Sequence, residues 1–183
     1  MMAMTLLIGG ARSGKSRLAT ELANKWGGPV TFIATAEGRD QEMTARIARH
    51  REERDEAWNT IEEAIEVAGA LSKVPAEELV ILDCLTLWVS NLLDRGFDPP
   101  DAEALAREAS SIAAARRGPV VVITNEVGAG IVPDNAAARA YRDLLGSINS
   151  IFAADAKHVL YVAAGHVVSM KRPEGVIDDV LDR

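Results

Sequence analysis

The stretch 9-GGARSGKS-16 decides the fold class, because it fits the phosphate-binding pattern G-x-x-x-x-G-K-[ST] at every specified position. The apolar run MTLLI precedes it, and an amphipathic helical pattern begins at Lys15. In such a P-loop the glycines let backbone amides surround phosphate oxygens, and the helix N-terminus adds partial positive charge. Lys15 is expected to reach the β and γ phosphates, and Ser16 to bind Mg²⁺. The alternative is a glycine-rich turn that contains lysine by coincidence, and the flanking strand and helix argue against it.

Outward from this loop, short apolar runs alternate with helical patterns. The runs rich in Val, Ile and Leu, as expected of strands buried on both faces, are 5–8, 30–34, 79–83, 120–125 and 159–163. Helical spacing of apolar residues lies between them, and one stripe consists of Ile61, Ile65, Ala68 and Leu71. A last run at 167–170 follows Gly165 closely enough for an antiparallel edge hairpin. The pattern predicts one domain, residues 1–183: an α/β three-layer sandwich of the P-loop NTPase (RecA-like) class with a mostly parallel sheet.

Composition narrows the class of protein. A chain of 183 residues can bury a full core, and its net charge of -7 argues against a nucleic-acid coat. No apolar run approaches the roughly 20 residues that a membrane span requires. Cys84 is the only cysteine, so the chain has neither a disulfide framework nor a cysteine metal cluster. We therefore expect a cytoplasmic protein with no nucleic-acid partner and no membrane span.

Polar residues end two of the predicted strands. Asp83 closes the run 79-LVILD-83, where a P-loop enzyme needs an acid to hold the water shell of Mg²⁺. Capping of the helical pattern 86–94 is the alternative role for Asp83. Asn125 and Glu126 emerge after the run 120–125, at the edge where open α/β sheets bind ligands. Glu126 is expected either to orient or deprotonate a substrate hydroxyl or to serve as a turn acid beside Gly128.

The stretch 46-RIARHREER-54 gathers four arginines around His50 on an acidic chain. At about 100° per residue, Met43, Ile47, His50 and Arg54 fall within one narrow stripe of a helix. A neutral imidazole is a nucleophile toward phosphorus, and nearby arginines would bind a triphosphate and disfavour imidazolium. The alternative is a half-buried helix histidine paired with Glu53 on a solvated basic face.

Five blocks of the chain, in order, resemble one enzyme family. The blocks are 8-IGGARSGKSRLA-19, 32-FIATAE-37, 43-MTARIARHREERDEAWNTIEE-63, 81-ILDCLTLWVSNLL-93 and 123-ITNEVGAGIVPDNAAARAYRDLLGSIN-149. They are similar to the bifunctional adenosylcobinamide kinase / adenosylcobinamide-phosphate guanylyltransferase family of cobalamin biosynthesis. A P-loop alone is shared by many classes of enzyme, whereas R-I-x-x-H-x-x-x-R followed by W-x-T-x-E is specific.

The resemblance implies two reactions, with adenosylcobinamide and its phosphate as substrates. The γ-phosphate of ATP or GTP passes to adenosylcobinamide, and a histidine then carries GMP from GTP to the cobinamide phosphate, giving adenosylcobinamide-GDP. It makes His50 the GMP carrier and Lys15 its catalytic partner in the P-loop. The implied nucleotide contacts are Gly9, Gly10, Ala11, Arg12, Ser13, Gly14, Lys15, Ser16, Ala34, Thr35, Ala36, Arg51, Glu52, Glu53, Arg54, Glu62 and Asp83, with Ser16 and Asp83 toward Mg²⁺. A monofunctional P-loop small-metabolite kinase is the alternative function, and a nonenzymatic nucleotide-binding module is a third.

The resemblance also implies a homotrimer in which helices of one subunit help to form a neighbour's site. Two residues depart from the family pattern. Asp55 follows Arg54 where the family usually has proline, so the helix that carries His50 is expected to extend further or to stop differently. His166 replaces an apolar residue and is expected to be a surface or hairpin residue.

Overall fold

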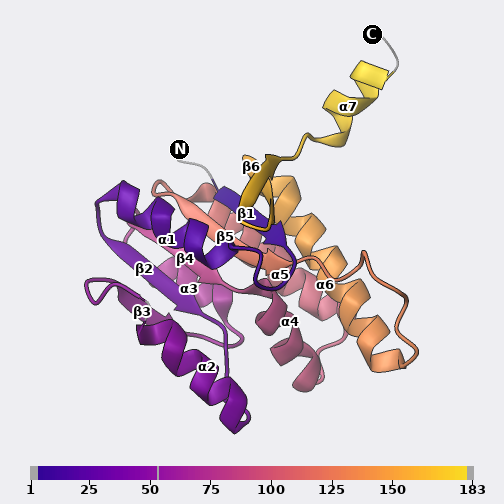
Figure 1. Ribbon diagram of the computed structural model, residues 1–183, viewed down its shortest axis with the longest axis horizontal. Helices are drawn as coiled ribbons and strands as arrows, with labels where there is room; N and C mark the ends of the chain where they lie inside the picture. Colours follow the sequence, from indigo (N-terminus) through magenta and orange to yellow (C-terminus); the bar gives the residue numbers. More distant parts are fainter. Residues whose placement is uncertain (1–3, 53, 181–183) are drawn as a thin grey trace.

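A seven-stranded sheet forms the centre of the protein, seen in a computed structural model that describes residues 4–52 and 54–180 (Figure 1). The strands are β1 (Met4–Gly9), β2 (Val30–Ala34), β3 (Asn59–Glu62), β4 (Leu79–Asp83), β5 (Val120–Asn125), β6 (His158–Ala163) and β7 (His166–Ser169). Their order in the sheet is β3-β2-β4-β5-β1-β6-β7. All pairs are parallel except β6 with β7, which is antiparallel. The predicted mostly parallel sheet and its C-terminal hairpin are therefore confirmed.

Helices cover both faces of the sheet. They are α1 (Lys15–Trp26), α2 (Gln41–Glu52), α3 (Val67–Lys73), α4 (Leu85–Asp94), α5 (Pro99–Ala115), α6 (Ala136–Asp155) and α7 (Pro173–Val180). Successive strand residues alternate between two cores: Leu6 packs with residues of α3 to α6, whereas Leu7 packs with Ala19 and Ala23 of α1. Two apolar faces require two helical layers, and the three-layer sandwich follows.

Helix α2 is the exception among the longer helices, because none of its side chains is fully buried. It leads from the carboxyl end of β2 and returns the chain to β3, at the edge of the sheet (Figure 1). Its N-terminus is fixed locally, since Asp40 Oδ1 accepts a hydrogen bond from the Met43 amide at 2.7 Å. Helix α2 therefore contributes little to the two cores, and an ion pair of Arg51 with Glu62 links it to β3.

The helical stripe predicted from Ile61 to Leu71 is wrong at its first half. Ile61 lies in strand β3, parallel to β2, and α3 begins only at Val67. Between them, Glu63 Oε1 accepts the amides of Ile65 and Glu66, both at 2.9 Å, and turns the chain. Ile61 and Ile65 both pack on the larger core, but from two different elements. The spacing of four residues between Ile61 and Ile65 therefore does not indicate a helix here.

The C-terminal hairpin forms one edge of the sheet, and α7 extends away from the body of the sandwich (Figure 1). All four residues of β7 are exposed, unlike those of the inner strands. Within residues 4–52 and 54–180, no helix is both long enough and apolar enough to cross a membrane. The ligand-binding edge of the sheet lies elsewhere, where β1, β2, β4 and β5 end.

Candidate active site at the carboxyl edge of the sheet

The P-loop connects β1 to α1 as predicted. Gly14 precedes the helix with a φ of 107°, a left-handed conformation that favours glycine. Lys15 Nζ donates to the carbonyls of Gly9 at 3.0 Å and Gly10 at 2.7 Å, and it contacts Ser13 Oγ at 3.3 Å. The ammonium group therefore sits inside the loop, where phosphate oxygens would replace some of these weaker neutral acceptors.

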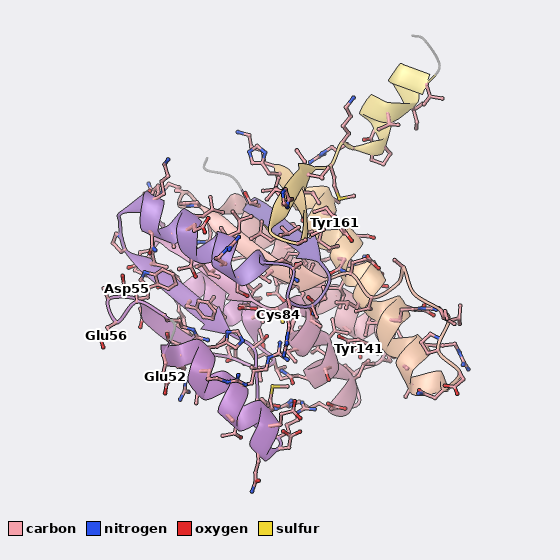
Figure 2. The ribbon with its side chains drawn as sticks, in the orientation of Figure 1. Glu52, Asp55, Glu56, Cys84, Tyr141 and Tyr161 are labelled. Carbon is pink, nitrogen blue, oxygen red and sulfur yellow. The ribbon has the colours of Figure 1, made fainter. Side chains whose placement is uncertain are left out.

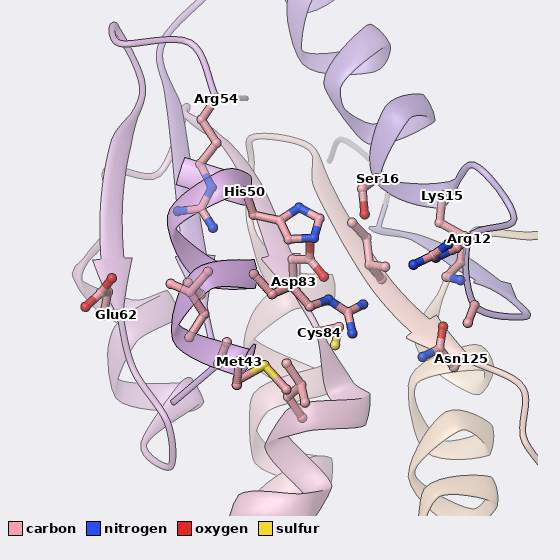
Figure 3. A pocket seen from close by; sticks show the side chains of 17 residues that line it. Arg12, Lys15, Ser16, Met43, His50, Arg54, Glu62, Asp83, Cys84 and Asn125 are labelled. Atoms are coloured by element: carbon pink, nitrogen blue, oxygen red, sulfur yellow. The ribbon is translucent and has the colours of Figure 1, made fainter. Parts of the chain in front are cut away.

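One central pocket lies beside this loop and collects most of the residues predicted to act (Figure 3). The predicted residues that line it are Ala11, Arg12, Lys15, Ser16, Ala34, Ala36, His50, Arg54, Glu62 and Asp83. Met43, Ile47, Leu87, Ile123 and Asn125 contribute further wall. Four strand ends, the P-loop and α2 thus meet at one cavity.

Charges of both signs face each other in the central pocket. Burial raises the pKa of the Asp83 carboxyl, while its interactions with His50, Arg54 and Lys15 act in the opposite direction. Burial likewise lowers the pKa of Lys15, against the influence of Cys84 and Asp83. Asp83 does not cap α4: Cys84 holds the N-cap position, and no side chain there makes a capping hydrogen bond. The Asp83 side chain is instead directed to the pocket (Figure 3).

His50 reaches the pocket from α2, together with Met43 and Ile47 of the same helical stripe. Its ring lies beside the Asp83 carboxyl and opposite Ser16 and Lys15 of the P-loop (Figure 3). The stripe predicted from helical spacing is therefore correct for these three residues. The alternative pairing of His50 with Glu53 lies outside the described residues, as does the predicted nucleotide contact of Glu53.

Arg54 follows α2 and folds back over the sheet. Its guanidinium carbon lies 3.8 Å from the centre of the Phe32 ring, a cation–π contact. Burial lowers the pKa of Arg54, and its Nη1 is buried without a hydrogen-bond partner. A buried donor left without an acceptor is costly, so this atom is suited to an anionic ligand in the pocket.

Glu62 ends β3, directly beside Ala34 at the end of β2. Its carboxylate forms an ion pair with Arg51 of α2. Both side chains are about half exposed, so the pair contributes little to stability. When a ligand displaces Arg51, the Glu62 carboxylate can instead accept hydrogen bonds from two N–H donors of that ligand.

Four predicted contacts among the described residues do not line the central pocket through their side chains, and the predicted glycines Gly9, Gly10 and Gly14 are also absent from its lining. Ser13 is buried, and its Oγ accepts from Lys15 Nζ inside the P-loop. Thr35 is fully buried, and its hydroxyl donates to the Cys84 carbonyl at 2.7 Å, joining the ends of β2 and β4. Glu52 lies on the outer side of α2, away from the pocket (Figure 2). Arg51 is directed to Glu62, as described above.

Asp55 resolves how the chain leaves α2. The helix ends at Glu52, and Asp55 Oδ1 accepts the amide of Ala57 at 2.9 Å, forming a tight turn toward β3.

Glu126 accepts the amide of Gly128, which is the turn role considered above. His166 is exposed in the hairpin, with Nδ1 3.1 Å from the Ala164 carbonyl oxygen. Its expected surface position is confirmed.

A polar network that sequence patterns did not indicate fixes the loop before α2. Glu37 pairs with Arg95 and Arg39, and Arg39 also donates to Asn91 Oδ1 at 2.7 Å. Asn91 is buried and donates to the Thr35 carbonyl at 2.7 Å. Glu37 and Arg39 lie in the loop after β2, whereas Asn91 and Arg95 lie in α4 and directly after it. Only the proximity of these two segments in the folded chain identifies the network. The pattern of charges along the sequence does not indicate this network.

Comparisons with known proteins agree on fold and family. The family model described as Cobinamide kinase / cobinamide phosphate guanyltransferase matches residues 5–170. The chain is similar to "Bifunctional adenosylcobalamin biosynthesis protein CobU" of Escherichia coli strain K12, with 41% identity over 92% of this chain and 99% of that protein. "Bifunctional adenosylcobalamin biosynthesis protein CobP" of Pseudomonas aeruginosa is 38% identical over 91% of this chain and 96% of that protein.

Solved structures share the fold at low identity. The RadB recombinase is 21% identical, with a TM-score of 0.51 over 87% of this chain and 73% of that chain. A Pyrococcus horikoshii OT3 protein is 10% identical, with a TM-score of 0.56 over 94% of this chain and 88% of that chain. These likenesses support the P-loop NTPase sandwich and carry nothing about substrate.

Proposed function

The chain belongs to the cobinamide kinase / cobinamide phosphate guanyltransferase family, and from that premise we propose that one site performs both reactions. The enzyme phosphorylates adenosylcobinamide with ATP or GTP, and it then transfers GMP from GTP to the resulting phosphate. The observation that carries the proposal is the meeting of His50, Lys15, Ser16 and Asp83 at one central pocket. A kinase alone has no use for a nucleophile facing the P-loop.

In the kinase step the protein acts by positioning and charge. Lys15 and the loop amides hold the β and γ phosphates, and the substrate hydroxyl attacks the γ-phosphorus in line. The bond from that phosphorus to the β–γ bridging oxygen breaks, the nucleoside diphosphate leaves with the electron pair, and the hydroxyl proton passes to solvent. Ser16 and Asp83 suit Mg²⁺, because a hydroxyl and a carboxylate at the same pocket are the hard oxygen ligands that it prefers. When bound, the ion neutralises negative charge on the polyphosphate.

In the first transfer step a ring nitrogen of neutral His50 attacks the α-phosphorus of GTP. The bond from that phosphorus to the bridging oxygen breaks, and pyrophosphate leaves with the electron pair. Arg54 lies on the same side of the pocket and offers its buried Nη1 to the phosphate charge. Glu62 is the acid suited to the guanine edge, because it can accept two N–H donors at once.

The test is to incubate the protein with α-labelled GTP and Mg²⁺, denature it, and measure acid-labile, base-stable label on the chain. His50→Ala is expected to remove the label while phosphorylation of adenosylcobinamide continues. His166→Ala, at an exposed histidine of the hairpin, is the matched control and is expected to keep the label. Unlabelled wild-type protein with kinase activity would support a monofunctional kinase instead. Label that survives His50→Ala would move the nucleophile to another residue.

Assembly as a homotrimer in the cytoplasm is part of the proposal. The support is an exposed apolar set on the C-terminal extension, which includes Val167, Val168, Met170, Val176 and Ile177. Apolar side chains gathered on a projecting element are typical of an interface between subunits. The corrinoid is far larger than the central pocket, so a groove between subunits would give it room.

A further inference from the structure

A second cavity, here called the outer groove, lies between α2 and the P-loop with the first turn of α1, and residues 11–16 form one of its walls. Its walls include Arg12, Arg17, Arg46 and Arg49, together with Lys15 and His50. Glu42 is the one carboxylate among its described lining residues. Five cations around about 610 Å³ of space, on a chain with a net charge of -7, form a local site for anions.

Two of these arginines lie outside the lining of the central pocket. Arg17 and Arg49 line the outer groove but are not among the described residues of the central pocket. Both are exposed, and the pairing of Arg17 with Glu21 at 3.6 Å is between two largely solvated side chains. Such a pair is worth little, so Arg17 remains available to a ligand. The outer groove is continuous with the central pocket, since both cavities are lined by Ala11, Arg12, Lys15, Ser16, Arg46 and His50.

The stereochemistry of phosphoryl transfer decides which anion enters the groove. Displacement at phosphorus runs in line, with entering and leaving groups on opposite sides. When His50 has taken GMP, pyrophosphate departs from the side opposite the imidazole, which is the side of the P-loop. The next acceptor must attack from that same side. Its phosphate therefore has to pass between the P-loop and α2, where the outer groove lies.

We propose that the outer groove binds the phosphate monoester of the phosphorylated acceptor during the second transfer, with Arg17 and Arg49 as its outer cations. The inference rests on the proposed function and adds a binding site to it. In this step an oxygen of the monoester forms a bond to the phosphorus held by His50. The phosphorus–nitrogen bond breaks, its electron pair returns to the imidazole, and a pyrophosphate linkage results. No other reactant is required.

The test separates discharge of the GMP-carrying protein from its formation. Wild-type protein and Arg49→Gln are loaded with labelled GMP, freed of nucleotide, and mixed with adenosylcobinamide phosphate or, separately, with pyrophosphate. Loss of one charge-assisted contact is expected to raise the acceptor concentration for half-maximal discharge about tenfold in Arg49→Gln. Discharge by pyrophosphate, which uses the P-loop, is expected to change by less than about threefold. The acceptor concentration for half-maximal discharge in Arg49→Lys is expected to lie between those of wild-type protein and Arg49→Gln, because lysine keeps the charge and loses the planar guanidinium fork.

Arg107→Gln is the matched control, since Arg107 is an exposed arginine of α5 that pairs with Glu103 of its own helix. Several results would overturn the proposal: unchanged discharge by the acceptor in Arg49→Gln, or an equal effect on pyrophosphate. An equal rise in the KM for unphosphorylated adenosylcobinamide would do so too, because the groove would then bind the corrinoid rather than its phosphate. Wild-type protein that never carries GMP would contradict the proposed function itself. Normal loading with normal discharge in Arg49→Gln contradicts the outer groove alone.

Discussion

Cys84 lies at the carboxyl end of the sheet, between the central pocket and the core (Figure 2). Burial, aided by the negative charge of Asp83, raises the pKa of its thiol to about 12. Only the thiolate reacts with alkylating reagents, so the folded protein is expected to resist iodoacetamide at pH 8. Unfolding in denaturant returns the pKa toward about 8.5 and restores reactivity. Mass spectrometry checks this, and alkylation of the native chain at the unfolded rate would contradict the burial.

Gly9 is a position where packing leaves no room for a side chain. A Cβ there would lie 2.1 Å from the Val162 carbonyl oxygen of β6, the neighbouring strand. Gly9→Ala is therefore expected to push β1 and β6 apart and to lower the free energy of unfolding by about 1–3 kcal/mol. Gly10→Ala is the matched control, because a Cβ there meets nothing within 4 Å. Urea titration measures both variants, and equal stability of the two would show that the strand shifts without cost.

The P-loop residues were the part of the site that the sequence could predict. Their roles depend on a backbone conformation that a local pattern specifies, so motif and structure agree from Gly9 to Ser16. The burial of Thr35 could not be predicted, since its hydroxyl bonds to Cys84, 49 positions further along the chain. The same holds for the contact of Arg54 with Phe32, which requires the chain after α2 to fold back.

At the scale of elements, α5 shows a local device that stabilises a long helix. Asp98 occupies its N-cap, where Oδ1 accepts the Asp101 amide at 2.9 Å, and prolines occupy the first helical positions. Asp98→Ala is expected to lower the free energy of unfolding by about 1 kcal/mol, or Tm by about 2–4 °C for a chain of this size. Asp98→Ser retains a capping oxygen and is expected to recover most of the loss. Thermal unfolding measures it, and a loss as large in Asp98→Ser would assign the effect to charge instead of capping.

Helices and strands were predictable where one periodicity extended over enough residues. The 20-residue α6 buries Leu144, Leu145, Ile148 and Phe152 along one stripe, and the sequence spacing of these residues is helical. The four-residue β3 is too short to show a period, and its burial pattern is mostly exposed. The spacing of apolar residues across β3 and α3 therefore gives one apparent helical stripe that the structure does not contain. Pairing with β2 makes β3 a strand, and that pairing is a long-range property.

At the scale of the whole molecule, alternation of elements predicted a parallel sheet but not the order of its strands. That order places β5 between β1 and β4, so the P-loop and Asp83 end two strands apart at the same edge. Helix α2, between β2 and β3, lines the pocket at this edge with Met43, Ile47 and His50. Helix α2 has no fully buried side chain, so packing in a core does not fix the distance from His50 to the P-loop. The order of the strands and the path of the chain between β2 and β3 set that distance.

The C-terminal extension carries the last prediction. Val168 in the edge strand β7 and Ile177 in the projecting helix α7 are 61% and 54% exposed (Figure 1). Exposed apolar surface of this kind gains about 25 cal/mol per Å² when a second subunit covers it. If the proposed trimer uses this surface, Val168→Glu places a charge in the contact and is expected to shift the assembly toward monomer in light scattering after size exclusion. Asn24→Glu adds the same charge to an exposed position of α1 and is expected to leave the assembly unchanged. A trimer that persists in Val168→Glu would assign the interface to another face, and the apolar extension would then have to serve the corrinoid or a different protein.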